Sequence, residues 1–176
     1  SEAELGVPVR ATMDTVELGA TDAGVAVLMD AIGAAADGIV VIGRVKPHTS
    51  FRGPIESGLC KMLVIGLGNR EGAESIHAHD LVTTIPAAAR VALAKAPVRM
   101  GVALVENAFD RPHRLAVVGP EAFEATDREF LQVARRVLPR VPLDELDLLL
   151  VDRMGKNISG TGMDPNIIGR ILLPGI

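Results

Sequence analysis

Basic and polar side chains gather in the sixteen residues that follow an apolar, strand-like run at 38–45. Two lysines, an arginine and a histidine in this segment favour binding of an anion, and the glycines allow a ligand to approach the backbone closely. Ligands of open parallel sheets bind outside the carboxyl ends of the strands, so the position suits a site. A solvated basic loop beside a helix start explains the same composition. The residues concerned are Lys46, His48, Thr49, Arg52, Gly53, Glu56, Ser57, Gly58 and Lys61.

Lys61 stands inside the apolar run LCKMLVIG, where an ammonium group must reach water, form an ion pair or take part in chemistry. In an apolar pocket the pKa of a lysine falls, and its neutral amine becomes a nucleophile toward carbonyl-type carbon. The alternative is a lysine on the water-facing side of a helix whose other side is buried. Both interpretations stay open at the level of the sequence.

Two histidines, His77 and His79, lie two residues apart in ESIHAHD. Side chains at this spacing on a helix point to different faces, so the pair cannot easily bind one metal ion together. One neutral imidazole can still ligate a transition metal. The alternative is that both histidines cap a surface turn.

A third segment, GKNISGTGMDPN at 155–166, is rich in glycine and small polar residues. Such a run can form a nest of backbone N–H groups that holds phosphate or carboxylate, and loops of this length usually carry function. It is not a P-loop, because the order GxxxxGK[ST] is absent.

Short β-branched apolar runs alternate with longer helical stretches along the chain. This alternation predicts an α/β domain with a mostly parallel sheet flanked by helices. The run at 38–45 predicts a strand buried on both faces, and the segment 56–68 fits either a helix or a strand. Strands are expected near 7–12, 38–45, 98–106, 114–118 and 147–153, and helices at 22–36, 70–80, 85–95 and 121–138.

Three of the expected helices have recognisable sequence features. The helix at 22–36 is rich in alanine and has Asp22 as a candidate N-cap. Pro86 would lie in the first turn of the helix at 85–95. The helix at 121–138 is amphipathic, and its apolar stripe contains Phe123, Phe130, Leu131, Ala134 and Leu138.

The composition excludes several classes of protein. The chain has 176 residues, 48% of them hydrophobic, which is enough for a domain with its own core. A formal net charge of −4 and an aromatic content of 2% argue against nucleic acid as a partner. The apolar runs are too short to span a membrane. The single cysteine, Cys60, excludes an internal disulfide and a multi-thiolate metal site within one chain.

The ends of the chain add two expectations. The start, SEAELGVPVR, lacks the basic and apolar regions of a secretion signal, so we expect a cytoplasmic location. Both ends resemble cuts within a longer chain, so we expect residues 1–176 to be a single domain whose partners include the remaining domains of a parent protein. The sequence leaves homo-oligomer formation open.

The stretch VKPHTSFRGPIESGLCKMLVIGLGNREGAESIH at 45–77 resembles the core of the lactate racemase family, the nickel-pincer-dependent 2-hydroxyacid racemases and epimerases. The resemblance extends over nearly the whole chain. Within the family, the chain resembles most a branch of racemase-domain proteins that carries the loop seen here as GKNISGTGMDPN. It implies an isomerase that transfers hydride between a 2-hydroxyacid and its cofactor. The substrate would be lactate-like or a sugar-derived acid.

The same resemblance implies a role for each polar residue of this stretch. Lys61 would bind the pyridinium thioamide mononucleotide covalently, and His77, sixteen positions later, would ligate its nickel. His48 would be a catalytic acid/base that removes the hydroxyl proton. Four residues would contact the cofactor: Ser57, Gly58, Lys46 and Arg52.

Two further hypotheses remain beside the enzyme. The basic loop and the glycine-rich segment can hold a phosphorylated or carboxylated small ligand in a non-catalytic binding module. The chain can also be an interaction domain in which the motifs have no present role.

Overall fold

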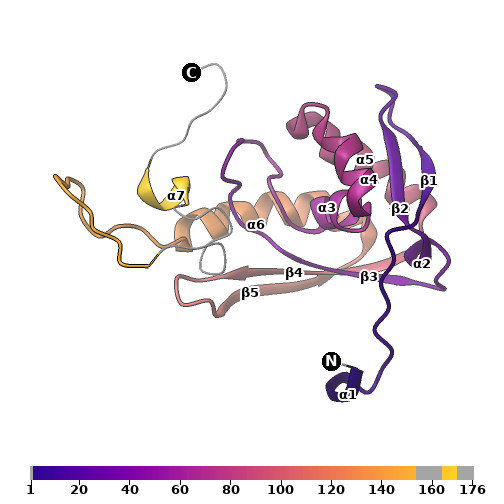
Figure 1. Ribbon diagram of the computed structural model, residues 1–176, viewed down its shortest axis with the longest axis horizontal. Helices are drawn as coiled ribbons and strands as arrows, with labels where there is room; N and C mark the ends of the chain where they lie inside the picture. Colours follow the sequence, from indigo (N-terminus) through magenta and orange to yellow (C-terminus); the bar gives the residue numbers. More distant parts are fainter. Residues whose placement is uncertain (1, 154–163, 170–176) are drawn as a thin grey trace.

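A computed structural model describes residues 2–153 and 164–169 of the chain as helices around two small sheets (Figure 1). In chain order the elements are α1 (Glu2–Leu5), β1 (Thr15–Ala20), β2 (Ala26–Asp30), α2 (Ala31–Ala34), β3 (Ile39–Arg44), α3 (Leu59–Lys61), the π-helix η1 (Met62–Gly66), α4 (Asn69–His77), α5 (Leu81–Lys95), β4 (Val98–Glu106), β5 (Pro112–Val118), the 3₁₀-helix η2 (Pro120–Ala122), α6 (Phe123–Val137) and α7 (Pro165–Ile168). The expected α/β class is confirmed.

The sheets are mixed rather than mostly parallel. One sheet has the strand order β3-β4-β5, in which β3 and β4 are parallel and β4 and β5 antiparallel. The other is the antiparallel pair β1-β2. The expectation of a mostly parallel sheet was wrong for β4 and β5 because only a short turn connects them. Parallel neighbours need a crossover of a dozen or more residues, so these two strands pair antiparallel. The helices from α3 to α5 provide that crossover between β3 and β4.

Two expected strands are not strands. Residues 7–12 are irregular, and both Val7 and Val9, on either side of Pro8, are exposed. The segment 147–153 is also irregular, with Leu148 73% and Leu150 80% exposed. An apolar run becomes a strand only where a neighbouring strand satisfies its backbone groups, and no described strand pairs with either segment.

In place of the expected helix at 22–36, the chain forms the strand β2 followed by the single helical turn α2. Val25, Val27 and Met29 are buried while the residues between them are only partly buried, which is the period-two pattern of a strand. Asp30, not Asp22, caps the helix that follows, because its side chain accepts a hydrogen bond from the backbone N–H of Gly33. The alanine-rich composition was therefore a weaker signal than the alternation of apolar residues.

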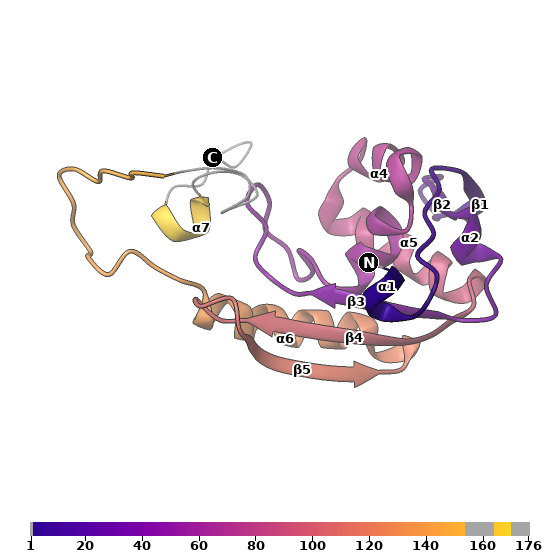
Figure 2. The same cartoon turned by 60° about the horizontal axis from the view of Figure 1, so that its bottom comes forward.

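The strands at 38–45, 98–106 and 114–118 are confirmed as β3, β4 and β5, but β3 is buried on one face only. Its residues alternate between buried and exposed, and α3 and α6 lie against the buried face of the sheet (Figure 1), with α6 alongside β4 also in Figure 2. Within the described residues, the opposite face keeps large apolar side chains in solvent: Val40, Ile42, Met100, Leu115 and Val117.

The helices at 70–80, 85–95 and 121–138 are confirmed as α4, α5 and α6. Helix α5 begins at Leu81, because Asp80 accepts hydrogen bonds from the backbone N–H groups of Val82 and Thr83. Pro86 therefore lies in the second turn and not in the first. Among residues 2–153 and 164–169, no helix combines the length and apolar character needed to cross a membrane.

The ambiguous segment 56–68 is helical, and a buried acid from α6 starts it. The two carboxylate oxygens of Asp127 accept hydrogen bonds from the backbone N–H groups of Leu59 (2.9 Å) and Cys60 (2.8 Å). Burial raises the pKa of Asp127 to about 6, although these two bonds act in the opposite direction. Asp127 thus caps α3 from another helix. Cys60, the second residue of α3, is fully buried.

Gly58 makes this cap possible, because it precedes α3 with φ 108° and has no side chain. A Cβ atom there would lie 2.1 Å from Oδ1 of Asp127.

We expect Gly58→Ala to lower the free energy of unfolding by more than about 3 kcal/mol, through backbone strain plus steric overlap. The matched control is Gly24→Ala, at φ 78° with no atom within 4 Å of its Cβ. It should cost only the strain, about 1 kcal/mol. Equal costs in urea unfolding would disprove the role given to the contact with Asp127.

Candidate functional site

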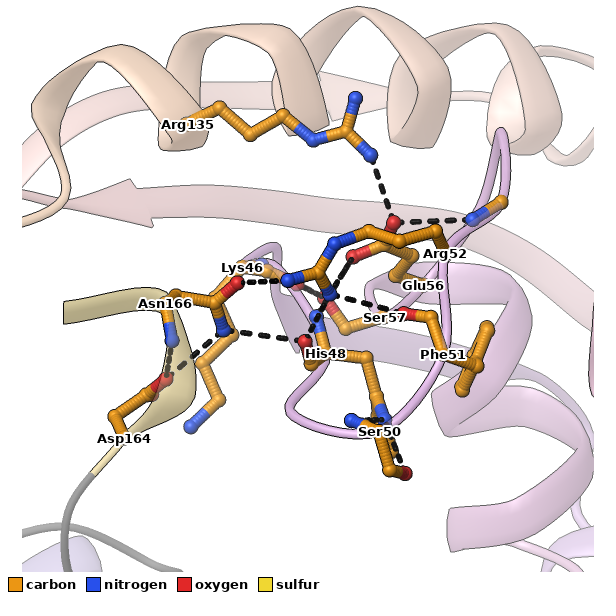
Figure 3. Close-up of polar contacts among 11 residues, drawn as sticks. Lys46, His48, Ser50, Phe51, Arg52, Glu56, Ser57, Arg135, Asp164 and Asn166 are labelled. Carbon is orange, nitrogen blue, oxygen red and sulfur yellow. Dashed lines mark hydrogen bonds and ion pairs between the residues drawn. The ribbon is translucent and has the colours of Figure 1, made fainter. Parts of the chain in front are cut away.

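The loop 45–57, which follows β3, is folded around the fully buried carboxylate of Glu56 (Figure 3). Its Oε2 accepts a hydrogen bond from the backbone N–H of His48 (2.8 Å), and its Oε1 accepts one from the backbone N–H of Gly53 (3.0 Å). Arg135 of α6 donates to Oε1 at 2.7 Å. A desolvated carboxylate is tolerated only when its oxygens are bonded in this way. Glu56 therefore joins both halves of the loop to α6.

Ser57 closes the base of the loop against Lys46. Its Oγ accepts a hydrogen bond from the Lys46 N–H (2.7 Å) and donates one to the Lys46 carbonyl (2.6 Å). Arg52 is used within the protein as well, since its guanidinium donates to the carbonyls of His48 and Phe51 and lies 3.7 Å from Glu56. Three of the residues expected to contact a cofactor therefore have structural contacts. Ser57 and Arg52 stabilise the loop 45–57, and Gly58 lies at the start of α3 against Asp127.

His48 lies half-buried in this loop, with its ring centroid 4.3 Å from that of Phe51. The backbone N–H of Ser50 donates to Nδ1 (3.1 Å), so the neutral ring carries its proton on Nε2. Burial, followed by the positive charge of Lys61, lowers the pKa of His48 to about 4. Because unfolded His48 takes up a proton at higher pH, this residue destabilises the fold as the pH falls from 6.5 to about 4.

Lys61, the last residue of α3, lies close to the Phe51 ring that also contacts His48. Its Nζ is 5.8 Å from the centroid of Phe51, which places Phe51 in contact with both His48 and Lys61. Burial and the nearby charge of Lys46 lower the pKa of Lys61, whereas Glu56 opposes the change. Within the described part of the chain, neither lysine ammonium forms an ion pair. Lys61 therefore lies within electrostatic reach of the His48 imidazole and forms no ion pair with a described acid.

His77 ends α4 and is exposed. Its Nδ1 donates a hydrogen bond to the carbonyl of Ala73 (2.7 Å), which leaves the Nε2 lone pair of the neutral ring free. Metal-bound histidines in proteins are oriented by the same kind of bond. The charge of His77 also contributes to the low pKa of His48, so the two rings lie within electrostatic reach of each other.

The short helix α7 is attached to the loop through Asn166. Its Oδ1 accepts a hydrogen bond from Arg52, and its Nδ2 donates to the carbonyl of His48 (3.1 Å; Figure 3). Asp164 caps α7 by accepting from the backbone N–H of Asn166 (2.8 Å). Residues 155–163 of the expected glycine-rich loop at 155–166 lie outside the described part of the chain. Its last residues, 164–166, lie beside the basic loop.

The sequence pointed to the basic residues and missed the acids that place them. Asp127 lies on the apolar stripe of α6, between Phe123 and Phe130, and an acid at such a position signals a buried partner. Glu56 directly follows the buried Ile55, but no local pattern pairs it with Arg135, 79 residues away. Asn166 is the last residue of the glycine-rich segment at 155–166, but no local pattern pairs it with Arg52 or His48.

Removal of the charge of Lys61 should raise the pKa of His48. We expect the pKa of His48 in Lys61→Met to rise from about 4 but to stay below 6.5, because burial, the larger cause, remains. An NMR titration of the ring nitrogens measures this pKa, with His48→Gln to assign the signals. Lys95→Met, at the far end of α5, should leave the value unchanged. No rise in Lys61→Met would mean that the two side chains do not interact.

Glu56→Gln keeps the shape of the side chain but removes the charge that faces Arg135. We expect it to lower the free energy of unfolding by about 2–3 kcal/mol, because buried donors lose a charged acceptor and the new amide brings a donor of its own. The matched control is Glu74→Gln, which breaks the exposed Arg70–Glu74 pair and should leave stability almost unchanged. Equal urea midpoints for the two variants would contradict the central role of Glu56.

Comparison with known proteins adds no relative to this picture. A scan against protein-family models gave no match, and a search of curated proteins found none that matches the chain.

Proposed function

We propose that this chain is a racemase- or epimerase-like domain that acts on a 2-hydroxyacid, with Lys61 as the attachment point of a nickel-pincer pyridinium thioamide mononucleotide. The main support is the environment of Lys61, which is half-buried, without an ion-pair partner among the described residues, and lowered in pKa by burial and by Lys46. A lower pKa increases the share of neutral amine, which is the form that attacks a carbonyl-type carbon.

The residues present fit this cofactor at two points. Lys61 offers the amine for the covalent link. His77 offers Nε2 to the metal while Nδ1 is held by the carbonyl of Ala73. The described residues contain no cluster of three metal-ligating side chains, so nickel would depend on ligand atoms of the cofactor together with His77. When bound, the cofactor supplies reversible acceptance of a hydride from the substrate carbon.

His48 would hold and return the hydroxyl proton of the substrate. With Ser50 N–H bonded to Nδ1, the ring presents Nε2–H and acts as a hydrogen-bond donor. Proton abstraction by Nε2 needs the other tautomer, in which Nδ1–H donates to a neighbour. Ser50 Oγ, 3.2 Å from Nδ1, is placed to accept that bond. The low pKa of His48 keeps the ring neutral at pH 7 in either tautomer.

Lys46 would hold the carboxylate of the substrate, since the amine of Lys61 is used for the covalent link to the cofactor. The loop 45–57, which carries Lys46, lies at the carboxyl ends of the parallel pair β3–β4, where ligands of α/β sheets bind.

A second candidate is a non-catalytic module that binds a carboxylated or phosphorylated small molecule. Two observations favour it: the lysine ammonium groups lack acidic partners among the described residues, and His48 presents Nε2–H as a donor. These groups suffice for anion binding without any cofactor.

Lys61→Ala separates the two candidates in protein produced together with the enzymes that make the cofactor. For the enzyme, we expect the wild type to carry a mass adduct and nickel and to racemise a 2-hydroxyacid, and Lys61→Ala to lose all three while its melting temperature stays close to wild type. The control, Lys46→Ala, should keep the adduct and the nickel.

For the binding module, neither protein carries an adduct. Lys61→Ala should then weaken binding of lactate or phosphate by about ten- to a hundredfold, the loss of one charge-assisted contact. An adduct that persists in Lys61→Ala would refute the assignment of Lys61.

A further inference from the structure

The face of the sheet β3-β4-β5 that points away from α3 and α6 is apolar across all three strands. Its most exposed residues, Ile42, Leu115 and Val117, are each about 60% exposed. Strands about 4.8 Å apart and side chains about 6.8 Å apart along each strand make this patch roughly 300 Å². Apolar patches of this size on a single chain often serve an interaction. The register places the side chains in three rows: Val40 and Met100, then Ile42, Val102 and Val117, then Leu104 and Leu115.

A second apolar surface lies on the same side of the molecule, in the segment 2–13, which we call the arm. Figure 1 shows α1 and the rest of the arm on the opposite side of the sheet from α6. In Figure 2, turned so that this side comes forward, α1 lies in front of the strands. The arm joins the body at Thr12, whose carbonyl accepts a hydrogen bond from Asn69 (3.2 Å). Its large apolar side chains are all more than half exposed: Leu5 65%, Val7 55%, Val9 57% and Met13 63%.

The arm has the sequence pattern of a strand without a strand beside it. Apolar residues take every odd position from Val7 to Met13, which puts them on one side of an extended chain. This pattern is the one that predicts a strand at 7–12, and within the described chain no strand pairs with it. Pro8 has no backbone N–H to give to a neighbouring strand. The arm therefore suits a position across the face of a sheet, held by its side chains.

The area of the open face favours a partner that brings an arm of its own. Stable interfaces bury at least about 1,200 Å² in total, and two stacked faces of roughly 300 Å² each would bury only about half of that. If each arm lies on the face of the other copy, every copy buries both surfaces, and the total rises to roughly 1,200 Å². Within one chain the arm stands away from the face, since both surfaces remain exposed.

The charges at the edge of the face agree with such a contact. The arm begins with two acids, Glu2 and Glu4, in the first turn of α1. Arg99 lies next to Met100 at the start of β4, and its guanidinium donates a hydrogen bond to the carbonyl of Asp37 (3.0 Å). Among the described residues Arg99 forms no ion pair. The acidic start of an arm therefore finds a cation without a described acid beside the apolar rows.

We propose that two copies of this chain form a symmetric dimer by exchanging their arms. The apolar side of each arm, from Leu5 to Met13, lies on the open face of β3-β4-β5 of the other copy. Two-fold symmetry gives both copies the same contacts, so one step covers all the exposed apolar surfaces of arm and face. This inference is independent of the chemistry proposed at Lys61.

Sedimentation equilibrium of the whole chain and of three variants tests the inference. We expect the wild type to sediment with twice the mass of one chain and a dissociation constant in the micromolar range. Val9→Asp in the arm and Ile42→Asp on the face should each weaken the dimer by at least about tenfold, because a carboxylate would be buried in an apolar contact. The matched control is Leu150→Asp, at an apolar residue 80% exposed in another segment, which should leave the dissociation constant unchanged.

A mixture of the two weakened variants distinguishes arm exchange from the packing of two faces. The Ile42→Asp chain keeps an intact arm and the Val9→Asp chain an intact face, so a mixed dimer regains one of the two contacts. We expect the mixture to associate at least about tenfold more tightly than either variant alone, and more weakly than the wild type. Packing of two faces without arms predicts no effect of Val9→Asp and no gain in the mixture.

Four results would overturn the inference: a monomeric wild type, a dimer that survives Val9→Asp, a dimer lost in Leu150→Asp, or a mixture without gain. Val9 and Ile42 are both more than half exposed, so the variants should fold, which thermal melting checks. If Ile42→Asp melts well below the wild type, Val117→Asp on β5 of the same face takes its place in every measurement.

Discussion

The buried carboxylate of Glu56 is the constraint on which the site depends. A carboxylate without solvent is stable only if its oxygens receive several hydrogen bonds, and those bonds come from two points of its own loop and from Arg135. Once they form, the backbone of His48 is fixed, and the ring can reach Ser50 and Phe51 only in a narrow range of positions. Arg52 extends the same network to Asn166, so the electrostatics of one acid fix the loop and α7 together.

Helix α6 is the common support of the two groups that would do chemistry. Asp127, on one turn, caps α3 and so fixes the helix that ends at Lys61. Arg135, about two turns further, holds Glu56 and therefore the loop of His48. Neither Asp127 nor Arg135 contacts the imidazole of His48 or the ammonium group of Lys61. Their relative placement is nevertheless set by the spacing of two residues along one rigid helix.

The sequence predicted those parts of the fold in which local pattern and tertiary environment agree. Helix α6 has an apolar stripe that is buried as expected, and the β-branched run at 38–45 forms β3. The predictions failed where a partner decided the structure. Residues 26–30, within the alanine-rich segment 22–36, became a strand because β1 pairs with them. The apolar run at 147–153 has no partner strand within the described chain. For the site, residue types identified the basic loop. An acid on an apolar stripe, such as Asp127, indicates a buried partner, but a single sequence does not show that the partner is the distant Leu59.

The long-range closure of the site also has a kinetic consequence. The bond from Arg135 to Glu56 closes a loop of 79 residues, and the bond from Leu59 to Asp127 closes one of 68. Contacts between such distant residues form late, because the entropy of the intervening chain opposes them until the core has assembled. During synthesis, His48, Lys61 and His77 leave the ribosome well before α6, the helix that orders the loop around them. The nascent chain therefore carries its basic loop with Glu56 still in water, and the loop takes its final shape only when the last long helix docks.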